Sequence, residues 1–463
     1  MSSVTLMRSA VSQTSEGRSQ RQIGERWVRA LSLVAVTVAS WMMCTLMGGT
    51  WMFVARDRHP HEALVEVSKD LGGPISLEYV FLALFASVLL VPSLLGLLTQ
   101  AARANLGGRE EHLAVLRLIG ATAGEVRGMM ILESLRQALV GLVLGSVLYV
   151  VTCPAWSLLT FQEKRVGTWE MLTWWVIPAA WIVVLVLAAC SVWLALRRVA
   201  VTPLGVTKKI PPKGQSWITL VLSVVGAVVL YRALGSMNLA PGADAAAYAG
   251  MLVVAGGILT VNALIAVGII QLLARLSYRV PGAANYVATR RVGRGAKTTW
   301  KRVTALYFVA FIGGIGGWFS AVPEIEEAPA LKMIAGDIPS GVVITVVFAT
   351  VLMVSSTLLT QALSVVEQKQ LTKSLYFIGA PAAFHTKVAA REVGVPMLLV
   401  ALLGFGMGSL MGTVMVLVHV NVLDKLVLFG GLVLVALAGC VLAVVGTGRL
   451  REQVLLGMGR AKD

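Results

Sequence analysis

Ten long stretches of this 463-residue chain carry no charged side chain, and they constrain its fold more than any other feature. A helix needs about 20 apolar residues to cross the hydrocarbon core of a bilayer, and these stretches approach or exceed that length. Because lipid offers the backbone no hydrogen-bond partners, each stretch is expected to form a helix. They comprise residues 30–55, 79–102, 137–162, 171–196, 214–231, 245–274, 303–323, 338–366, 393–423 and 426–448.

The distribution of Lys and Arg predicts how these helices cross the membrane, since cytoplasmic loops carry an excess of both residues. With the N-terminus in the cytoplasm, 31 of the 39 Lys and Arg residues fall in cytoplasmic segments. We therefore predict a multi-pass protein of the cytoplasmic membrane with both termini in the cytoplasm. The net charge of +16 then reflects topology and contact with membrane lipid. We expect no nucleic-acid partner, because no soluble basic domain is present.

Internal repeats indicate a duplication. The pentapeptide LLTQA occurs at residues 97–101 and 358–362, each time at the end of a long span. Further matches follow in the same order: Ile119–Ala121 with Ile378–Ala380, Glu133 with Glu392, and Gly145 with Gly404. We predict an all-α integral membrane protein whose ten transmembrane helices form two parallel four-helix repeats joined by a two-helix linker.

The expected boundaries follow from this arrangement: a cytoplasmic N-tail (1–29), a first four-helix unit (30–200), a linker with spans five and six and a basic loop (201–302), a second four-helix unit (303–448) and a cytoplasmic C-tail (449–463).

The segment after each LLTQA copy predicts an elbow beyond the membrane. Residues 109–133 read REEHLAVLRLIGATAGEVRGMMILE, in which Thr122 and Glu125 form a capping box at the start of a helix. In the second copy, residues 367–392, Pro381 follows Gly379 and Ala380 and suits the first turn of a helix. Each copy therefore predicts a charged helix, a sharp turn and a short helix that leads into the next span.

This pattern, a charged helix with E-x-x-x-L-x-x-x-G-A-S/T followed by a helix that carries Glu before the third span, resembles the FtsX-like permease family. That family includes the membrane subunits of macrolide-export, lipoprotein-release and bacitracin-resistance ABC transporters. The resemblance covers both four-helix units; in the first copy His112 stands where the family has Glu, and the second copy departs at residues 374–377 and Pro381. Relatives carry a large external domain between spans one and two or spans seven and eight, and this chain has neither.

In the family, the short helix of the elbow docks in a groove of the ATPase. The resemblance thus implies that ATPase coupling involves Arg117, Gly120, Ala121, Thr122, Glu125 and Glu133 in the first unit and Gly379, Ala380, Pro381, His385 and Glu392 in the second. The alternative is that both segments are ordinary amphipathic helices at the membrane surface.

The chain lacks the residues of an ATPase or an ion-coupled carrier. It has no GxxxxGK[ST] phosphate-binding loop, so we expect a non-catalytic subunit without a cofactor or metal site of its own, with ATP and Mg²⁺ on a partner chain. No charged residue is predicted deep in a span, which argues against proton-coupled carriers and intramembrane proteases. Asn262 is the main amide at depth and is expected to form an interhelical hydrogen bond.

Small residues mark the expected contacts between helices. Glycines permit close approach of helix backbones in membranes, and we expect this of Gly141, Gly145, Gly313, Gly317, Gly404, Gly408 and Gly412. These contacts either hold the helices in fixed positions or allow the repeats to move against each other.

The resemblance implies a permease subunit of an ABC transporter, with two copies of a separate ATPase per permease. An external accessory protein is a further candidate partner. We expect export or removal of a hydrophobic or amphipathic compound, such as an antimicrobial peptide or a lipid-like molecule. Two alternatives remain open. One is a mechanotransmitting subunit that activates an extracellular cell-wall hydrolase without transporting a substrate. The other is an ATP-independent carrier or membrane enzyme.

Overall fold

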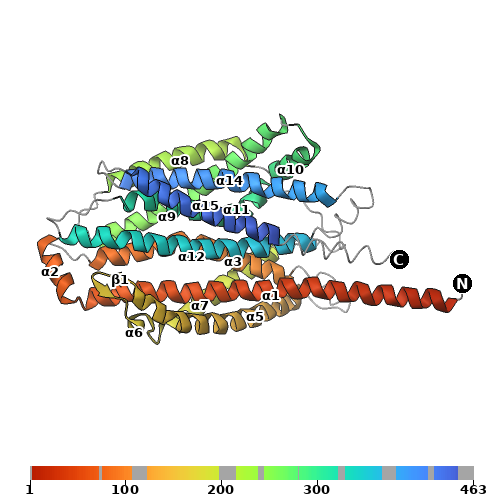
Figure 1. The fold of residues 1–463 in the computed structure, drawn as a ribbon, viewed down its shortest axis with the longest axis horizontal. Coiled ribbons are helices and arrows are strands. Elements are labelled where there is room, and N and C mark those ends of the chain that lie inside the picture. Colours follow the sequence, from red (N-terminus) through yellow and green to blue (C-terminus); the bar gives the residue numbers. More distant parts are fainter. Residues whose placement is uncertain are drawn as a thin grey trace.

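A computed structural model describes residues 3–71, 76–106, 123–197, 215–237, 245–279, 281–321, 329–367, 382–415 and 422–446. This part of the chain is almost entirely helical, as predicted for an all-α membrane protein (Figure 1). The long helices are α1 (Ser3–Arg58), α3 (Ser76–Leu106), α5 (Ala123–Thr152), α7 (Val176–Arg197), α8 (Trp217–Ser236), α9 (Ala245–Leu276), α11 (Ala296–Phe319), α12 (Pro329–Glu367), α14 (Ala382–Met415) and α15 (Leu423–Gly446).

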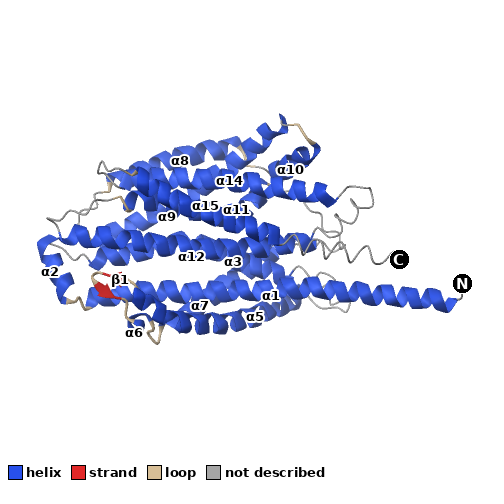
Figure 2. Ribbon diagram, viewed as in Figure 1, coloured by secondary structure: helices blue, strands red, loops and turns tan. Residues whose placement is uncertain are grey.

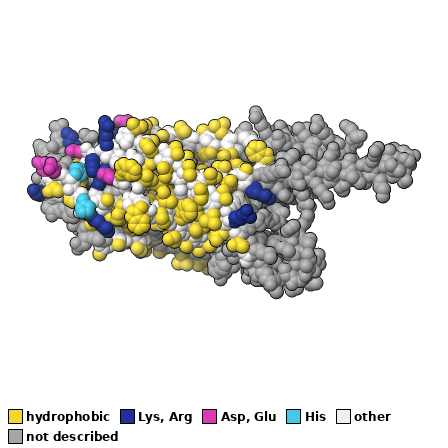
Figure 3. Space-filling view, turned by 90° about the horizontal axis from the view of Figure 1, so that it is seen from below, with side chains coloured by type: hydrophobic (Ala, Val, Ile, Leu, Met, Phe, Trp, Pro, Cys, Tyr) yellow, Lys and Arg dark blue, Asp and Glu magenta, His cyan; other side chains and the backbone are white. Residues whose placement is uncertain are grey.

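Nine helices within the described residues are long and apolar enough to cross a membrane. The segment expected as the fourth span is α7, whose described apolar part, Val176–Cys190, is shorter. In the space-filling view, hydrophobic side chains form a broad belt and charged side chains gather beyond it, most of them at one end (Figure 3). This distribution is typical of a protein that spans a bilayer. The ten-span repeat itself remains a prediction.

Two groups of four helices show the same packing pattern. In the first group α1 contacts α3, α5 and α7, while α7 also contacts α3 and α5. In the second group α11 contacts α12, α14 and α15, while α15 also contacts α12 and α14. The first, second, third and fourth helices of each group thus have equivalent neighbours, which is the arrangement expected of a duplicated unit. The groups meet where α1 and α3 contact α12, and where α3 contacts α11.

Helices α8 and α9 pack against each other and cover one side of the second group. The Asn262 side chain in α9 is buried, and its Nδ2 donates a hydrogen bond to the Tyr231 hydroxyl of α8 (3.1 Å). The same hydroxyl donates to the Met407 carbonyl of α14 (3.2 Å). The interhelical role predicted for Asn262 is confirmed, and the pair of bonds links both helices of the linker to the second group.

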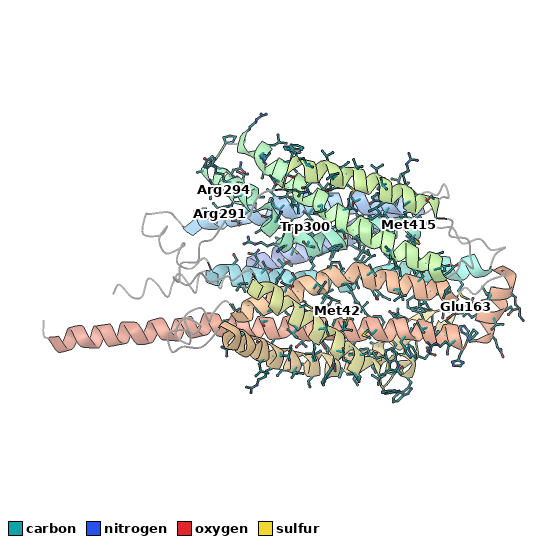
Figure 4. All side chains as sticks on the ribbon, turned by 180° about the vertical axis from the view of Figure 1, so that it is seen from behind. Met42, Glu163, Arg291, Arg294, Trp300 and Met415 are labelled. Carbon is teal, nitrogen blue, oxygen red and sulfur yellow. The ribbon has the colours of Figure 1, made fainter. Side chains whose placement is uncertain are left out.

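The two ends of the bundle differ. One end carries α2 (Glu62–Leu71), the 3₁₀ helix η1 (Cys153–Leu158), a hairpin of β1 (Thr160–Phe161) and β2 (Lys164–Arg165), and α6 (Thr168–Met171); we call it the hairpin end (Figure 2). The opposite end carries η2 (Ser277–Arg279) and α10 (Ala283–Arg294), and α1 extends beyond the bundle there. Glu163 at one end and Arg291 and Arg294 at the other are well separated (Figure 4).

Candidate functional site

Most residues predicted to couple to an ATPase lie outside the described part of the structure. These are Arg117, Gly120, Ala121, Thr122, Gly379, Ala380 and Pro381. Glu125 and Glu133 fall on α5 and His385 falls on α14, but their side chains are likewise outside the description. The elbows therefore remain predictions. They follow α3 and α12, both of which end on the side of the bundle opposite the hairpin.

Glu392 is the one predicted coupling residue whose side chain is described. It is largely buried on α14, and its carboxylate forms ion pairs with Arg302 of α11 (3.1 Å) and Arg291 of α10 (3.3 Å). These charges tie the first part of α14 to α10, in the basic loop of the linker, and to the start of α11.

The glycines of α14 lie in a close seam with α11. A Cβ at Gly404 would lie 2.5 Å from the Tyr307 carbonyl oxygen, and one at Gly408 would overlap the Phe311 backbone. A Cβ at Gly412 would lie 2.7 Å from Trp318. Across the other side of α11, Gly313 approaches Val433 and Gly317 approaches Leu426 of α15.

The equivalent seam of the first group joins α1 and α5. A Cβ at Gly141 would lie 2.6 Å from Val36, and one at Gly145 would lie 2.6 Å from Ser40. Gly48 of α1 faces the Tyr149 hydroxyl in the same way. In both groups, the glycines of the third helix thus lie against the first helix.

Gly408→Ala should lower the thermal stability of the solubilised protein, because the nearest atoms are Phe311 backbone atoms that cannot rotate away. Overpacking of this kind costs about 1–3 kcal/mol. The matched control is Gly406→Ala in the same helix, where nothing lies within 4 Å of the new Cβ and helix propensity favours Ala. Unfolding followed by tryptophan fluorescence measures both. Equal melting temperatures for the two variants would contradict the seam.

The two LLTQA copies face each other where α3 meets α12. Gln100 of the first copy accepts hydrogen bonds at Oε1 from Ser356 (2.9 Å) and from Thr360 of the second copy. Gln361 is buried beside them. We call this contact the glutamine clasp. The repeated pentapeptide was the sequence signal, but without an expected pairing of α3 with α12 it gave no reason to bring its copies together.

An apolar cavity of about 200 Å³ lies between the two groups, toward the hairpin end. Its walls come from α1, α3, α11 and α12, with Trp156, Phe161, Val166 and Met171 contributed by the segment between α5 and α7. The hydroxyls of Thr45, Thr50 and Thr345 each donate to a carbonyl of their own helix. The wall therefore presents hydrocarbon and satisfied hydroxyls, an environment suited to an apolar ligand.

Asp337 is the one charged side chain among the described residues that line the cavity. The sequence pattern placed Asp337 in the loop before the eighth span, whereas α12 already begins at Pro329. The first part of α12 packs against α2, where Met333 is buried with Leu64 and Val67. Asp337 Oδ2 accepts hydrogen bonds from the Tyr79 hydroxyl (2.7 Å) and the Gln162 backbone N–H (2.7 Å).

The hairpin reaches Asp337 through its tip. Gln162 and Glu163 adopt positive φ angles of 57° and 60°, which identifies the two-residue turn that best fits the twist of a hairpin. Non-glycine residues rarely adopt this conformation, so contacts made by the tip must hold it. The Gln162 N–H meets Asp337, and the Gln162 carbonyl lies 2.9 Å from His61 Nε2. We call the contact between the hairpin tip and Asp337 the hairpin clasp.

Arg56 anchors the base of the hairpin. Its guanidinium is buried and donates to the carbonyls of Phe161 (2.8 Å) and Arg165 (3.0 Å) and to the Glu170 carboxylate (2.7 and 3.0 Å). Lys164 Nζ forms a second ion pair with Glu170 (2.6 Å). The sequence pattern predicted a loop starting at Arg56, but α1 runs to Arg58 and carries Arg56 into the interior.

Glu170 should keep the hairpin docked at neutral pH and release it in acid. Burial opposes its ionisation, but hydrogen bonds from Lys164 and Arg56 outweigh burial and hold the pKa of Glu170 below its ordinary value of 4.5. The stabilisation is therefore complete above about pH 4.5 and is lost as the pH falls through the lowered folded-state pKa. Amide exchange of residues 159–167 across this range measures the release.

Glu170→Gln should show the increased exchange already at neutral pH, whereas Glu163→Gln, which alters an exposed carboxylate of the same hairpin, should not. Protection here means the exchange rate relative to the intrinsic rate at each pH. If the unmodified protein already loses protection of these amides well above pH 5, another group controls docking.

The fold and these contacts define a multi-pass α-helical membrane protein with two similarly packed halves and an apolar cavity between them. Residues 83–204, about a quarter of the chain, match the model of the family described as FtsX-like permease C-terminal. The match confirms the FtsX-like resemblance over this stretch, which runs from α3 past α7. FtsX-like permeases are non-catalytic membrane subunits that work with ABC ATPases. Comparison with curated proteins and with solved structures gave no significant match.

Proposed function

We propose that the chain is the permease subunit of an ABC transporter that removes or exports a hydrophobic or amphipathic compound, driven by a separate ATPase. The observation that carries this proposal is the apolar cavity between the two helix groups. A lipid-like tail would bury its methylene groups there, each worth about 0.8 kcal/mol. The hairpin end would face outward, as the Lys and Arg distribution predicts, so that the cavity would lie toward the outer leaflet.

The cavity lies between two polar contacts that join the groups. The hairpin clasp lies at one end, and the glutamine clasp joins α3 to α12 toward the other. Polar contacts of this kind can break and re-form without unfolding the helices, because a hydrogen bond contributes about 0.5–1.5 kcal/mol between neutral groups and about 1.5–3 kcal/mol to a charged group such as Asp337. Separation of the groups at either end would thus change access to the cavity without disrupting the glycine seams within each group.

Force would arrive at the two elbows. ATP-driven closure of two ATPase subunits would push the elbow after α3 and the elbow after α12 together, and the Glu392 ion pairs would carry the movement into α10 and α11. This mechanism requires one ATPase contact per elbow, which supports two ATPase copies for each permease. ATP and Mg²⁺ would belong to those subunits.

Reconstitution tests the proposal. The chain and its partner ATPase are placed in liposomes that contain a fluorescent single-chain amphiphile, and transfer of the probe to external albumin is followed. Transfer that needs the permease, the ATPase and ATP together is the expected result. Transfer at the same rate without the ATPase would support an ATP-independent carrier. ATP hydrolysis without transfer, accompanied by activation of a cell-wall hydrolase, would instead support mechanotransmission.

A further inference from the structure

The carboxylate of Asp337 has an oxygen that the fold does not use. Its Oδ2 accepts from both Tyr79 and the Gln162 backbone, while Oδ1 has no hydrogen-bond partner among the described residues. Asp337 is only partly buried, and it lines the cavity next to apolar residues of α3 and α12. An acceptor in such a position attracts a donor from a ligand, most strongly a charged one.

Three cations of the hairpin end are already engaged. The guanidinium of Arg56 donates hydrogen bonds to the Glu170 carboxylate and to two hairpin carbonyls. Lys164 also forms an ion pair with Glu170. Arg58 lies over the Trp51 ring at 5.3 Å. Glu163, exposed at the hairpin tip, adds a second negative charge to this region. Within the described structure, Asp337 thus has no ion-pair partner of its own.

The rest of the cavity restricts the ligand's shape. Its volume of about 200 Å³ is below the range of about 300–1,000 Å³ that is common for drug-sized ligands. Its threonine hydroxyls are occupied by their own helices. The cavity therefore fits one narrow apolar chain, with a single charged acceptor at the hairpin end.

We propose that the cavity selects single-chain amphiphiles with a cationic head, whose ammonium group binds Asp337 Oδ1 while the chain lies between α1, α3, α11 and α12. This inference rests on the proposed function, since it takes the cavity to be the amphiphile site. The proposed function left the head group open. Here its charge is positive, and Asp337 is the residue that recognises it. Removal of the charge should therefore alter selectivity without displacing the hairpin.

Binding in the absence of an ATPase tests this selectivity. The full chain is placed in phosphatidylcholine nanodiscs, and three spin-labelled probes of equal chain length are compared, with primary ammonium, phosphocholine and carboxylate heads. The immobilised fraction of each probe reports binding. We expect the cationic probe to bind about fivefold or more tightly than the others, as for a partly desolvated charge pair. Equal binding of the three probes, or no binding of any, would overturn the proposal.

Three variants test whether the charge of Asp337 causes the preference for the cationic probe. Asp337→Asn retains an oxygen for the hairpin clasp and should abolish the preference. Glu78→Gln removes a carboxylate at the hairpin end of α3. Glu78 does not line the cavity, so this variant should preserve the preference. Tyr79→Phe removes one hydrogen bond but no charge, and should also preserve it. A preference that survives Asp337→Asn, or that Glu78→Gln also abolishes, would reflect general surface charge and reject the site.

The outcomes separate the two proposals. If all chains bind regardless of head, the cavity remains an amphiphile site and only the role of Asp337 fails. If the cationic preference is present but no ATPase drives transfer, the transport function fails and the binding site stands.

Discussion

Replacement of Gly49 by leucine is expected to weaken amphiphile binding by at least about tenfold and to abolish ATP-dependent transfer of the probe. Gly49 lines the cavity from α1, and nothing lies within 4 Å of a Cβ built on it. Leucine therefore enters open space, and its higher helix propensity favours the fold. Exclusion of only two methylene groups forfeits about 1.6 kcal/mol, which corresponds to more than tenfold in affinity.

Gly341→Leu repeats this test from the opposite wall, since Gly341 lines the cavity from α12 and is equally free of contacts. The matched control is Gly431→Leu in α15, where a Cβ also meets nothing within 4 Å and which is not among the residues that line the cavity. Both cavity variants should lose binding while the control keeps it, with all three proteins equally stable. Transfer at the unmodified rate by both cavity variants would show that the substrate takes another route.

Arg56→Ala should cause the largest loss of stability at the hairpin end, of about 3 kcal/mol or more. Removal of one partner of a buried ion pair typically costs about 3–5 kcal/mol, and the ion pair that Glu170 keeps with Lys164 places Arg56→Ala at the lower end of this range. Here the change also removes the donors to the Phe161 and Arg165 carbonyls. Without this anchor, the positive φ angles of the hairpin tip have less to hold them, so the hairpin clasp on Asp337 should open.

Amide exchange at residues 159–167, together with thermal unfolding, measures this effect. Arg58→Ala is the control, because Arg58 is exposed two residues further along α1, with its guanidinium over the Trp51 ring and away from the hairpin carbonyls that Arg56 binds. Arg56→Lys, which keeps the charge but not the planar fork, should give an intermediate result. If the amides of residues 159–167 exchange at the same rate in Arg56→Ala and Arg58→Ala, the hairpin is held by its apolar contacts and not by the guanidinium.

The membrane fold could be predicted from sequence because charge and hydropathy act over whole helices. Lipid forces each long apolar stretch into a helix, so the ranges around Leu90 or Phe311 needed no tertiary information. The packing glycines could also be predicted, since a glycine within a span indicates close approach of two helix backbones. The structure places Gly145 and Gly408 at such approaches, against Ser40 and Phe311.

The candidate site was harder to predict, because it depends on which helices meet. The cavity is formed by residues up to about 300 positions apart in the sequence, and most are ordinary apolar residues. Asp337 and Arg56 were assigned to loops, because the apolar stretch of each span is shorter than its helix. Helix α1 extends past its apolar stretch to Arg58, and α12 begins before its own stretch, at Pro329. Their partners, a backbone N–H of the hairpin and a carboxylate in α6, carry no sequence pattern that would pair them.

The mass of the complex purified from native membranes tests the central claim most directly. The tagged chain is solubilised in mild detergent, its partners are identified, and the intact assembly is weighed by native mass spectrometry. Coupling through two elbows predicts one copy of the 49.1 kDa chain with two copies of an ABC ATPase, and ATP hydrolysis that the purified chain alone lacks. A complex without any nucleotide-hydrolysing subunit, paired with undiminished transfer of amphiphile by the chain alone, would contradict it.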